Sequence, residues 1–218
     1  CEQVIHSVVT MRRNSELTRV TCAGIVDADD YSPADVQYLQ KLGIATLGVS
    51  EIENVLLLPA VGAAIGDGEG FVGPELERRL AALKGEVFAT LQTSAAVEKV
   101  VVRYCRRRID RALKKIDLST ADSVADITAE YLKQTAELDI ATTAQGARDR
   151  INHALQTDDL PLLLAHYDHK ALLSLVPKYL KPSRLPDFES WLTRVLRNEK
   201  APALVAALKA SLPAISAS

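Results

Sequence analysis

The sequence lacks the features that mark secreted, membrane-spanning and strongly charged proteins. Its three cysteines, Cys1, Cys22 and Cys105, have spacings that fit neither a disulfide framework nor a zinc site. The longest apolar run, residues 55–65, is too short for a bilayer, which requires about 20 residues. The formal net charge of −2 gives no general attraction to nucleic acid, so such binding depends on local patches. We therefore expect a cytoplasmic protein without a membrane span.

Two apolar runs near the start of the chain each end in acidic residues. Residues 20–26 are followed by Asp27, Asp29 and Asp30, and residues 44–49 are followed by Glu51 and Glu53. Between the runs, Ser32 is a good helix cap and Gly43 a good helix terminator. The pattern predicts a β-α-β unit with parallel strands, preceded by a helix over residues 2–13. Both sets of acids then lie at the carboxyl edge of the sheet, where open α/β sheets bind ligands.

The acidic residues at this edge have the chemistry of a metal site. Asp27 and Asp29 project to the same side of an extended chain and repel each other unless a cation lies between them. Carboxylate oxygens suit Mg²⁺ or Mn²⁺. Either Glu51 or Glu53 completes the set of metal ligands, and Asp30 lies behind the ligands or in solvent. Glu53 has an equally good alternative, because S-E-I-E also fits a capping box between Ser50 and Glu53.

The stretch 74–156 reads as entirely helical, and the helix at 94–116 carries the only strongly basic patch. A cationic stripe of this kind can contact phosphates. The next helix, opened by Ser119 and Asp122, is acidic, which favours a second reading in which the two helices pair through opposite charges. The basic residues are Arg103, Arg106, Arg107, Arg108 and Arg111, and the acidic ones are Asp122, Asp126, Glu130 and Glu137.

The remaining segments carry weaker signals. Residues 160–165 form either a short strand or a helical turn, which periodicity alone does not decide. The glycines between 62 and 73 indicate a loop after a helix, because no P-loop lysine accompanies them. His166 and His169 are too isolated to predict a transition-metal site. Trp191 lies at core spacing in a helix, which predicts packing.

The acidic segments resemble a known family. The strand ending in G-I-V-D-A-D-D, followed by a strand ending in S-E-I-E-N-V-L-L-L-P, resembles the toprim (topoisomerase–primase) domain. The similarity is closest to overcoming-lysogenization-defect-type toprim nucleases and to the toprim effectors that work beside ABC-type ATPases in bacterial phage defence. It covers about the first 60 residues. The chain departs from the family in one respect, since toprim domains carry a glutamate at the end of an earlier strand and nothing before Cys1 supplies it. We expect the chain to be a fragment.

The resemblance implies an α/β fold, a toprim-like parallel sheet flanked by helices with a large helical insertion. The divisions are a partial core at 1–73, the insertion at 74–156, and a C-terminal segment at 157–218 that returns to the core. In this family a lysine at a helix start contributes to the active site, which makes Lys170 a candidate for transition-state stabilisation. Without the resemblance, Lys170 reads as a surface lysine.

These patterns predict a Mg²⁺-dependent or Mn²⁺-dependent endonuclease, a hydrolase that cuts DNA or RNA as the effector of an antiviral defence system with an ATPase partner. Asp27, Asp29, Glu53 and Lys170 are the expected catalytic residues, and Asp27, Asp29, Glu51 and Glu53 the metal ligands. The chain alone is expected to be inactive without the upstream glutamate, and a homo-oligomer is compatible with the pattern. The alternatives are a non-catalytic toprim-like module that docks on a partner ATPase, and a phosphohydrolase acting on small phosphates.

Overall fold

The computed structural model describes residues 2–14, 17, 22–28, 31–136, 138–198 and 200–215. The chain forms two compact units, one made of Cys1–Thr90 with Asp159–Ser218 and the other of Leu91–Asp158. The second unit falls largely within the predicted insertion at 74–156, and the three-part division itself stays a prediction. No helix in the described part of the chain is long and apolar enough to cross a membrane.

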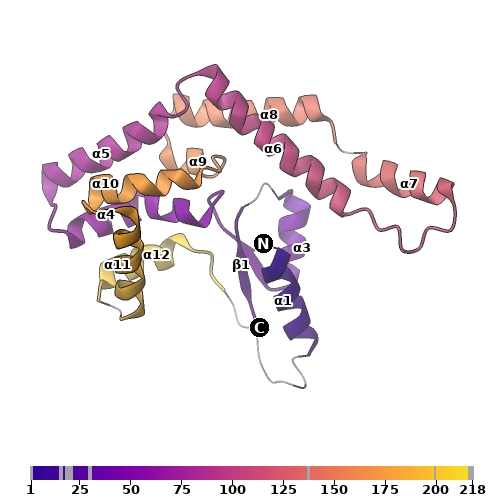
Figure 1. The fold of residues 1–218 in the computed structure, drawn as a ribbon, viewed down its shortest axis with the longest axis horizontal. Helices are drawn as coiled ribbons and strands as arrows, with labels where there is room; N and C mark the ends of the chain where they lie inside the picture. The colour runs from indigo at the N-terminus through magenta and orange to yellow at the C-terminus, as the bar shows by residue number, and fades with distance from the viewer. Residues whose placement is uncertain are drawn as a thin grey trace. The chain divides into compact units, whose positions relative to one another are not determined.

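The first unit begins with a small α/β layer. Helix α1 (Glu2–Arg13) is followed by strand β1 (Gly24–Val26), helix α3 (Pro33–Lys41) and strand β2 (Ile44–Thr46). The two strands are parallel, with Gly24 opposite Ile44 and Val26 opposite Thr46, which confirms the predicted β-α-β unit. Helices α1 and α3 lie beside the strands in Figure 1. The core of this layer consists of Val8, Val26, Leu39 and Ile44.

Local sequence signals explain the boundaries of this layer. Ser32 caps α3 through a complete capping box, in which its hydroxyl oxygen accepts a hydrogen bond from the Asp35 N–H at 3.1 Å and its own N–H donates to the Asp35 carboxylate. Gly43 ends the helix with a φ of +74°, a conformation that favours glycine. At Gly24, a Cβ would lie 2.7 Å from the Val4 side chain, so glycine lets α1 pack directly on β1. Both strands are shorter than the predicted runs, of which residues 20 and 21 lie outside the described part.

Helices make up most of the rest of the first unit. They are the 3₁₀ helix η1 (Ile52–Leu57), α4 (Pro59–Gly68), α5 (Gly73–Ala89), α9 (Leu160–Leu164), the 3₁₀ helix η2 (Lys170–Ser174), α10 (Leu175–Leu180), α11 (Leu185–Arg197) and α12 (Pro202–Ser211). Helix α4 lies among several of them and contacts α5, α10 and α12.

Three readings from the sequence are settled in this region. Residues 160–164 are helical, which decides the alternative between strand and helical turn. The prediction of a loop for the glycine-rich stretch is correct only in part, because Gly62 and Gly66 lie within α4, whereas Gly70, with a φ of +82°, lies in the turn that follows this helix. A Cβ at Gly62 would lie 3.2 Å from Leu180 and from Leu80, so the glycines let neighbouring helices approach closely. Trp191 packs as predicted, with its ring centroid 5.6 Å from that of the fully buried Phe188.

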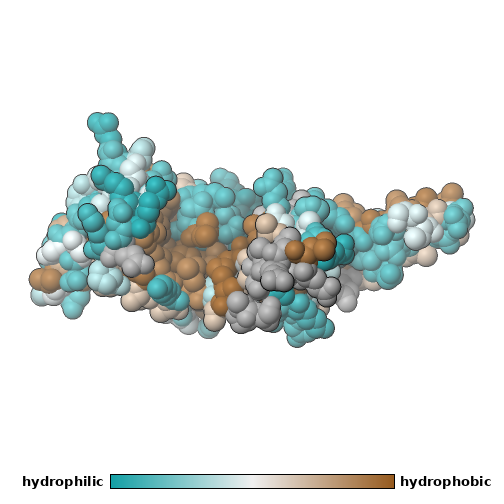
Figure 2. Space-filling view, turned by 90° about the horizontal axis from the view of Figure 1, so that it is seen from below, coloured by the Kyte–Doolittle hydropathy of each residue, from teal (hydrophilic) through white to brown (hydrophobic). Residues whose placement is uncertain are grey.

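In the second unit, the described residues form the helices α6 (Ser94–Lys114), α7 (Val124–Thr135) and α8 (Ile140–Gln156). Helix α6 packs against α8 through its buried apolar side. Helix α7 begins later than predicted, because Ser123 rather than Ser119 caps it. The structure describes every residue of α7 and none of them is buried. Figure 2 accordingly shows hydrophobic surface on this helix, at the right-hand end of the view.

Candidate functional site

Asp27 meets the segment that carries Glu51 and Glu53 at the carboxyl edge of the sheet. Asp27 is the first residue after β1, and Glu51 and Glu53 lie at the start of η1, a short distance beyond β2. One carboxylate oxygen of Asp27 accepts a hydrogen bond from the Ile52 N–H at 3.0 Å. This bond fixes the end of β1 against the segment that carries both glutamates. The β-α-β geometry thus brings together acids that are about 25 positions apart in sequence.

Lys170 joins the acids from a distant part of the chain. Its ammonium nitrogen lies 3.4 Å from an oxygen of Glu51 and 3.9 Å from an oxygen of Glu53. The Lys170 side chain is 67% exposed, whereas that of Glu51 is only 16% exposed. The lysine therefore covers the glutamates from the solvent side. Of the predicted catalytic residues, the structure brings Asp27, Glu53 and Lys170 into one neighbourhood.

Two buried residues connect these segments: Asn54, which the sequence analysis missed, and Ser50, for which it predicted a different role. The side-chain amide of Asn54 donates to the carbonyl oxygen of Tyr167 at 2.9 Å and to the hydroxyl oxygen of Ser50 at 3.3 Å. The N–H of Ser50 donates to the carbonyl oxygen of Leu164 at 2.9 Å. The sequence does contain a signal for Asn54, which is a single asparagine at the start of the apolar run N-V-L-L-L. A buried amide requires hydrogen-bond partners, so its presence there indicates a polar contact within the core.

The capping-box reading of Ser50 and Glu53 is wrong. Helix η1 has Glu51 at its N-cap, and no side chain among the described residues caps it. The Ser50 hydroxyl is occupied by Asn54 instead. One carboxylate oxygen of Glu53 is buried and has no hydrogen-bond partner within the described part of the chain. Glu53 is therefore oriented for something other than capping.

The pKa values of Glu51 and Lys170 are both shifted by their surroundings in this cluster. Burial raises the pKa of Glu51, the nearby Lys170 lowers it, and the negative charges of Asp27 and Glu53 raise it further, with a net upward shift. The pKa of Lys170 is raised by the charges of Glu51 and Glu53, with a smaller contribution from Asp27. Two carboxylates thus lie within 4 Å of one ammonium, and a perturbed acid such as Glu51 is typical of functional sites.

The carboxylates of this site are donors of the type that suits a hard divalent cation, but those the structure describes are not grouped into a metal site. The carboxylate oxygens of Asp27, Glu51 and Glu53 are the type that Mg²⁺ and Mn²⁺ prefer, and the buried, unbonded oxygen of Glu53 is suited to receive a cation. Asp29 and Asp30 lie outside the described residues. Within the described part of the chain, no three His, Cys, Asp or Glu side chains are grouped closely enough to hold a metal, and this includes those around His166 and His169.

The basic residues of α6 belong to the other unit. Arg106 is exposed, whereas Arg103, Arg107, Arg108 and Arg111 are half-buried. On the acidic helix α7, Asp126 accepts a hydrogen bond from Ser123, and Glu130 pairs with Lys133 of the same helix. An ion pair between α6 and α8 joins Glu98 to Arg148 at 2.9 Å. Pairing of α6 with α7 and binding of phosphates by α6 both stay predictions.

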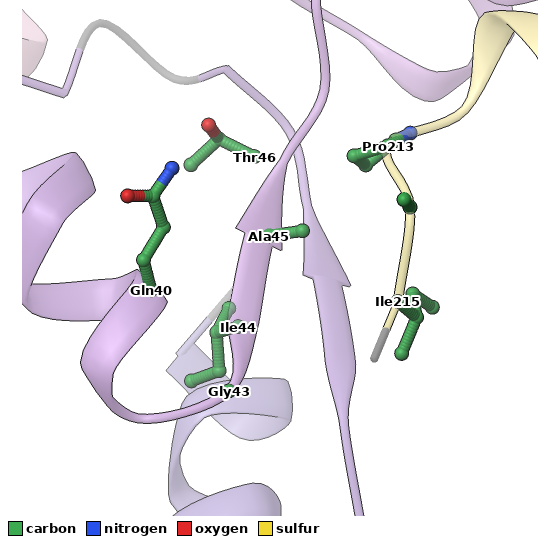
Figure 3. Close-up of a pocket in the computed structure, with 8 residues that line it drawn as sticks. Gln40, Gly43, Ile44, Ala45, Thr46, Pro213 and Ile215 are labelled. Carbon is green, nitrogen blue, oxygen red and sulfur yellow. The ribbon is translucent and has the colours of Figure 1, made fainter. Parts of the chain in front are cut away.

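A separate cleft of about 370 Å³ lies at strand β2. It is lined by Gln40, by residues 43–46 and by residues 213–215. Figure 3 shows Ala45 pointing toward the C-terminal segment with Pro213, while Gln40 lies on the opposite side of β2. The lining includes neither the acids nor Lys170, so this cleft is distinct from the acidic site.

Comparison of the chain with protein-family models, with curated proteins and with solved structures finds no match. The function must therefore be argued from the residues and their geometry.

Proposed function

We propose that this chain carries the active site of a toprim-like, metal-dependent endonuclease that hydrolyses phosphodiester bonds of DNA or RNA. The observation that supports the proposal is the convergence of Asp27, Glu51 and Glu53 with Lys170 at the carboxyl edge of a parallel β-α-β unit. Carboxylates at this place, beside a cation from a distant segment, have the composition of a phosphoryl-transfer site.

Each residue of the proposed site has its own role. Asp27, Asp29, Glu53 and Glu51 would hold Mg²⁺ or Mn²⁺, which supplies charge neutralisation at the attacked phosphate and a more acidic water. The Ile52 N–H holds the Asp27 carboxylate in one orientation. The Lys170 ammonium stabilises negative charge that develops on the phosphate oxygens. Its partial exposure leaves it accessible to a polyanionic substrate.

The proposal extends to partners. The basic face of α6, with Arg103, Arg106, Arg107, Arg108 and Arg111, contacts the nucleic-acid backbone. An ABC-type ATPase controls cleavage, and the pair acts in defence against phage. These two statements rest on the resemblance of the acidic segments to toprim effectors.

A cleavage assay with an Asp27 variant tests the proposal. The assay uses the product of the full reading frame and, beside it, the 218-residue chain. Asp27→Asn should abolish Mg²⁺-dependent or Mn²⁺-dependent cutting of DNA and RNA without lowering the melting temperature. The control is Asp67→Asn, which removes the same charge from an exposed position of α4. Undiminished cutting by Asp27→Asn would refute the assignment, and a protein that binds an ATPase but never cuts would favour a non-catalytic docking module.

A further inference from the structure

Asn54 is an unusual residue for its place in the fold. Its side chain is completely buried, and the three residues that follow it, Val55, Leu56 and Leu57, belong to the apolar core. Burying an amide is unfavourable unless its groups are hydrogen-bonded, and the Asn54 side-chain oxygen has no partner among the described residues. The amide nitrogen, by contrast, makes two hydrogen bonds, and an apolar side chain at this position would remove both of them.

The hydrogen bonds of Asn54 join two distant segments at the acidic site. Its amide nitrogen bonds to the carbonyl oxygen of Tyr167, 113 positions away in sequence. The backbone bond from Ser50 to Leu164 forms a second link between the same two segments. Asn54 lies next to Glu53, and Tyr167 lies three residues before Lys170. The two links thus lie on either side of the glutamates in the sequence, and both hold the segment that leads into Lys170.

We propose that Asn54 is a positioning residue that places Lys170 against Glu51 and Glu53. Lysine has a long and flexible side chain, and an exposed ion pair does little to hold it in one place. The backbone before Lys170 must therefore be fixed from elsewhere, and the buried bond from Asn54 to Tyr167 fixes it. That these residues form a reaction site rests on the proposed function, whereas the positioning of the ammonium does not.

The first test measures the position of Lys170 without any reaction. In the 218-residue chain, the NMR signal of the Lys170 ammonium reports its contact with the carboxylates, and a Glu51→Gln, Glu53→Gln double variant gives the reference for a released lysine. Asn54→Ala should move the signal toward that reference. The matched control is Val55→Ala, which opens a cavity at the neighbouring buried position but keeps both hydrogen bonds. An unchanged signal in a folded Asn54→Ala protein would overturn the proposal.

The second test is a double-mutant cycle on cleavage by the complete protein. Asn54→Ala should lower kcat by roughly 10- to 100-fold, as is usual for residues that orient the ligands of a site, with KM little changed. In a Lys170→Met background the same change should cost less than about twofold, because the residue acts through the lysine. Independent, multiplicative losses would show a general structural role and overturn the proposal.

A milder variant keeps both tests informative if Asn54→Ala fails to fold. Ser50→Ala removes only the hydroxyl that helps to orient the Asn54 amide, and it should produce a smaller loss of the same kind in both measurements. A folded Ser50→Ala protein with unchanged signal and unchanged kcat would then count against the proposal. If Asp27→Asn cuts normally, the proposed function fails, while the NMR measurement still decides the role of Asn54.

Discussion

At the scale of single residues, the folded structure disfavours the negative charge of Glu51. Burial and the neighbouring Asp27 and Glu53 all disfavour the ionised carboxylate, and Lys170 offsets them only in part, so the pKa of Glu51 is raised. The folded protein therefore binds the Glu51 proton more tightly than the unfolded chain does. The stability that follows from this difference is present below the ordinary glutamate pKa and is lost as the pH rises through the raised value.

We predict that Glu51→Gln stabilises the protein at neutral pH, because it removes an ionised group that the folded state disfavours. The gain should disappear as the pH falls below the ordinary glutamate pKa, where the wild-type carboxyl is protonated in both states. Melting temperatures of the two proteins between pH 3.5 and 8, an interval chosen about that pKa, measure the difference. A variant less stable than wild type at neutral pH would show that the ion pair with Lys170 outweighs burial.

Lys170→Met should slow cleavage by the complete protein roughly 100-fold, because it removes a cation that stabilises the transition state. The melting temperature should change little, since the methionine keeps the apolar stem and the lysine is mostly exposed. The matched control is Lys178→Met, which breaks an ion pair with Glu86 at 2.6 Å that involves none of the site acids. Equal cleavage rates for Lys170→Met and wild type would show that Lys170 is a surface lysine without a part in catalysis.

Sequence patterns predict single residues of the site unevenly. Asp27 and the two glutamates can be predicted because strand ends in a β-α-β unit fall at one edge. Lys170 is predicted only through the family resemblance, because nothing local in the sequence brings it to a position more than 110 residues earlier. Asn54 was missed, and Ser50 was assigned the wrong role, because what both residues do depends on that same long-range contact. Residues that act by joining distant segments leave no periodic pattern in the chain.

At the scale of helices and strands, capping governs what the sequence predicts. The sequence predicts Ser32 as the cap of α3, and the proline that follows it is typical of the first turn of a helix. Two other capping predictions failed. Ser50 is used by Asn54, and Ser123 caps α7 in place of Ser119. Several serines near a helix start offer equivalent local chemistry, so tertiary contacts decide between them.

Removing the α3 cap should destabilise the crossover that joins the two strands. Ser32→Ala should lower the free energy of unfolding by about 1 kcal/mol, the typical cost of losing a serine N-cap. Chemical denaturation measures this change. The control is Ser174→Ala, since Ser174 occupies the N-cap position of α10 but makes no capping hydrogen bond there. Equal effects of the two substitutions would show that the capping box adds nothing to stability.

The arginines of α6 test whether this helix binds nucleic acid. The triple change of Arg106, Arg107 and Arg108 to alanine should weaken binding and reduce the slope of log K against log salt by about 2 to 3, since each lost phosphate contact contributes about 0.7 to 0.9. Lys99→Ala removes one exposed charge near the start of the same helix and serves as the control. A loss of thermal stability with unchanged binding would instead favour pairing between the basic and acidic helices.

At the scale of the whole chain, the unit Leu91–Asp158 interrupts the sequence of the first unit, which is made of Cys1–Thr90 and Asp159–Ser218. The segments on either side of the interruption meet through several interactions of their own. Glu86 pairs with Lys178 and accepts a hydrogen bond from Tyr179, and Glu69 pairs with Lys181. Together with the bond from Asn54 to Tyr167, these contacts hold the first unit together from within.

We therefore predict that the first unit folds when Leu91–Asp158 is replaced by a flexible linker between Thr90 and Asp159. A shorter connection also lowers the entropic cost of joining the two segments. The NMR signal of Lys170 should match that of the intact chain, while affinity for nucleic acid should fall because α6 is missing. An unfolded product would show that the second unit supports the first. A folded product that binds nucleic acid as tightly as the intact chain would place the binding surface outside α6.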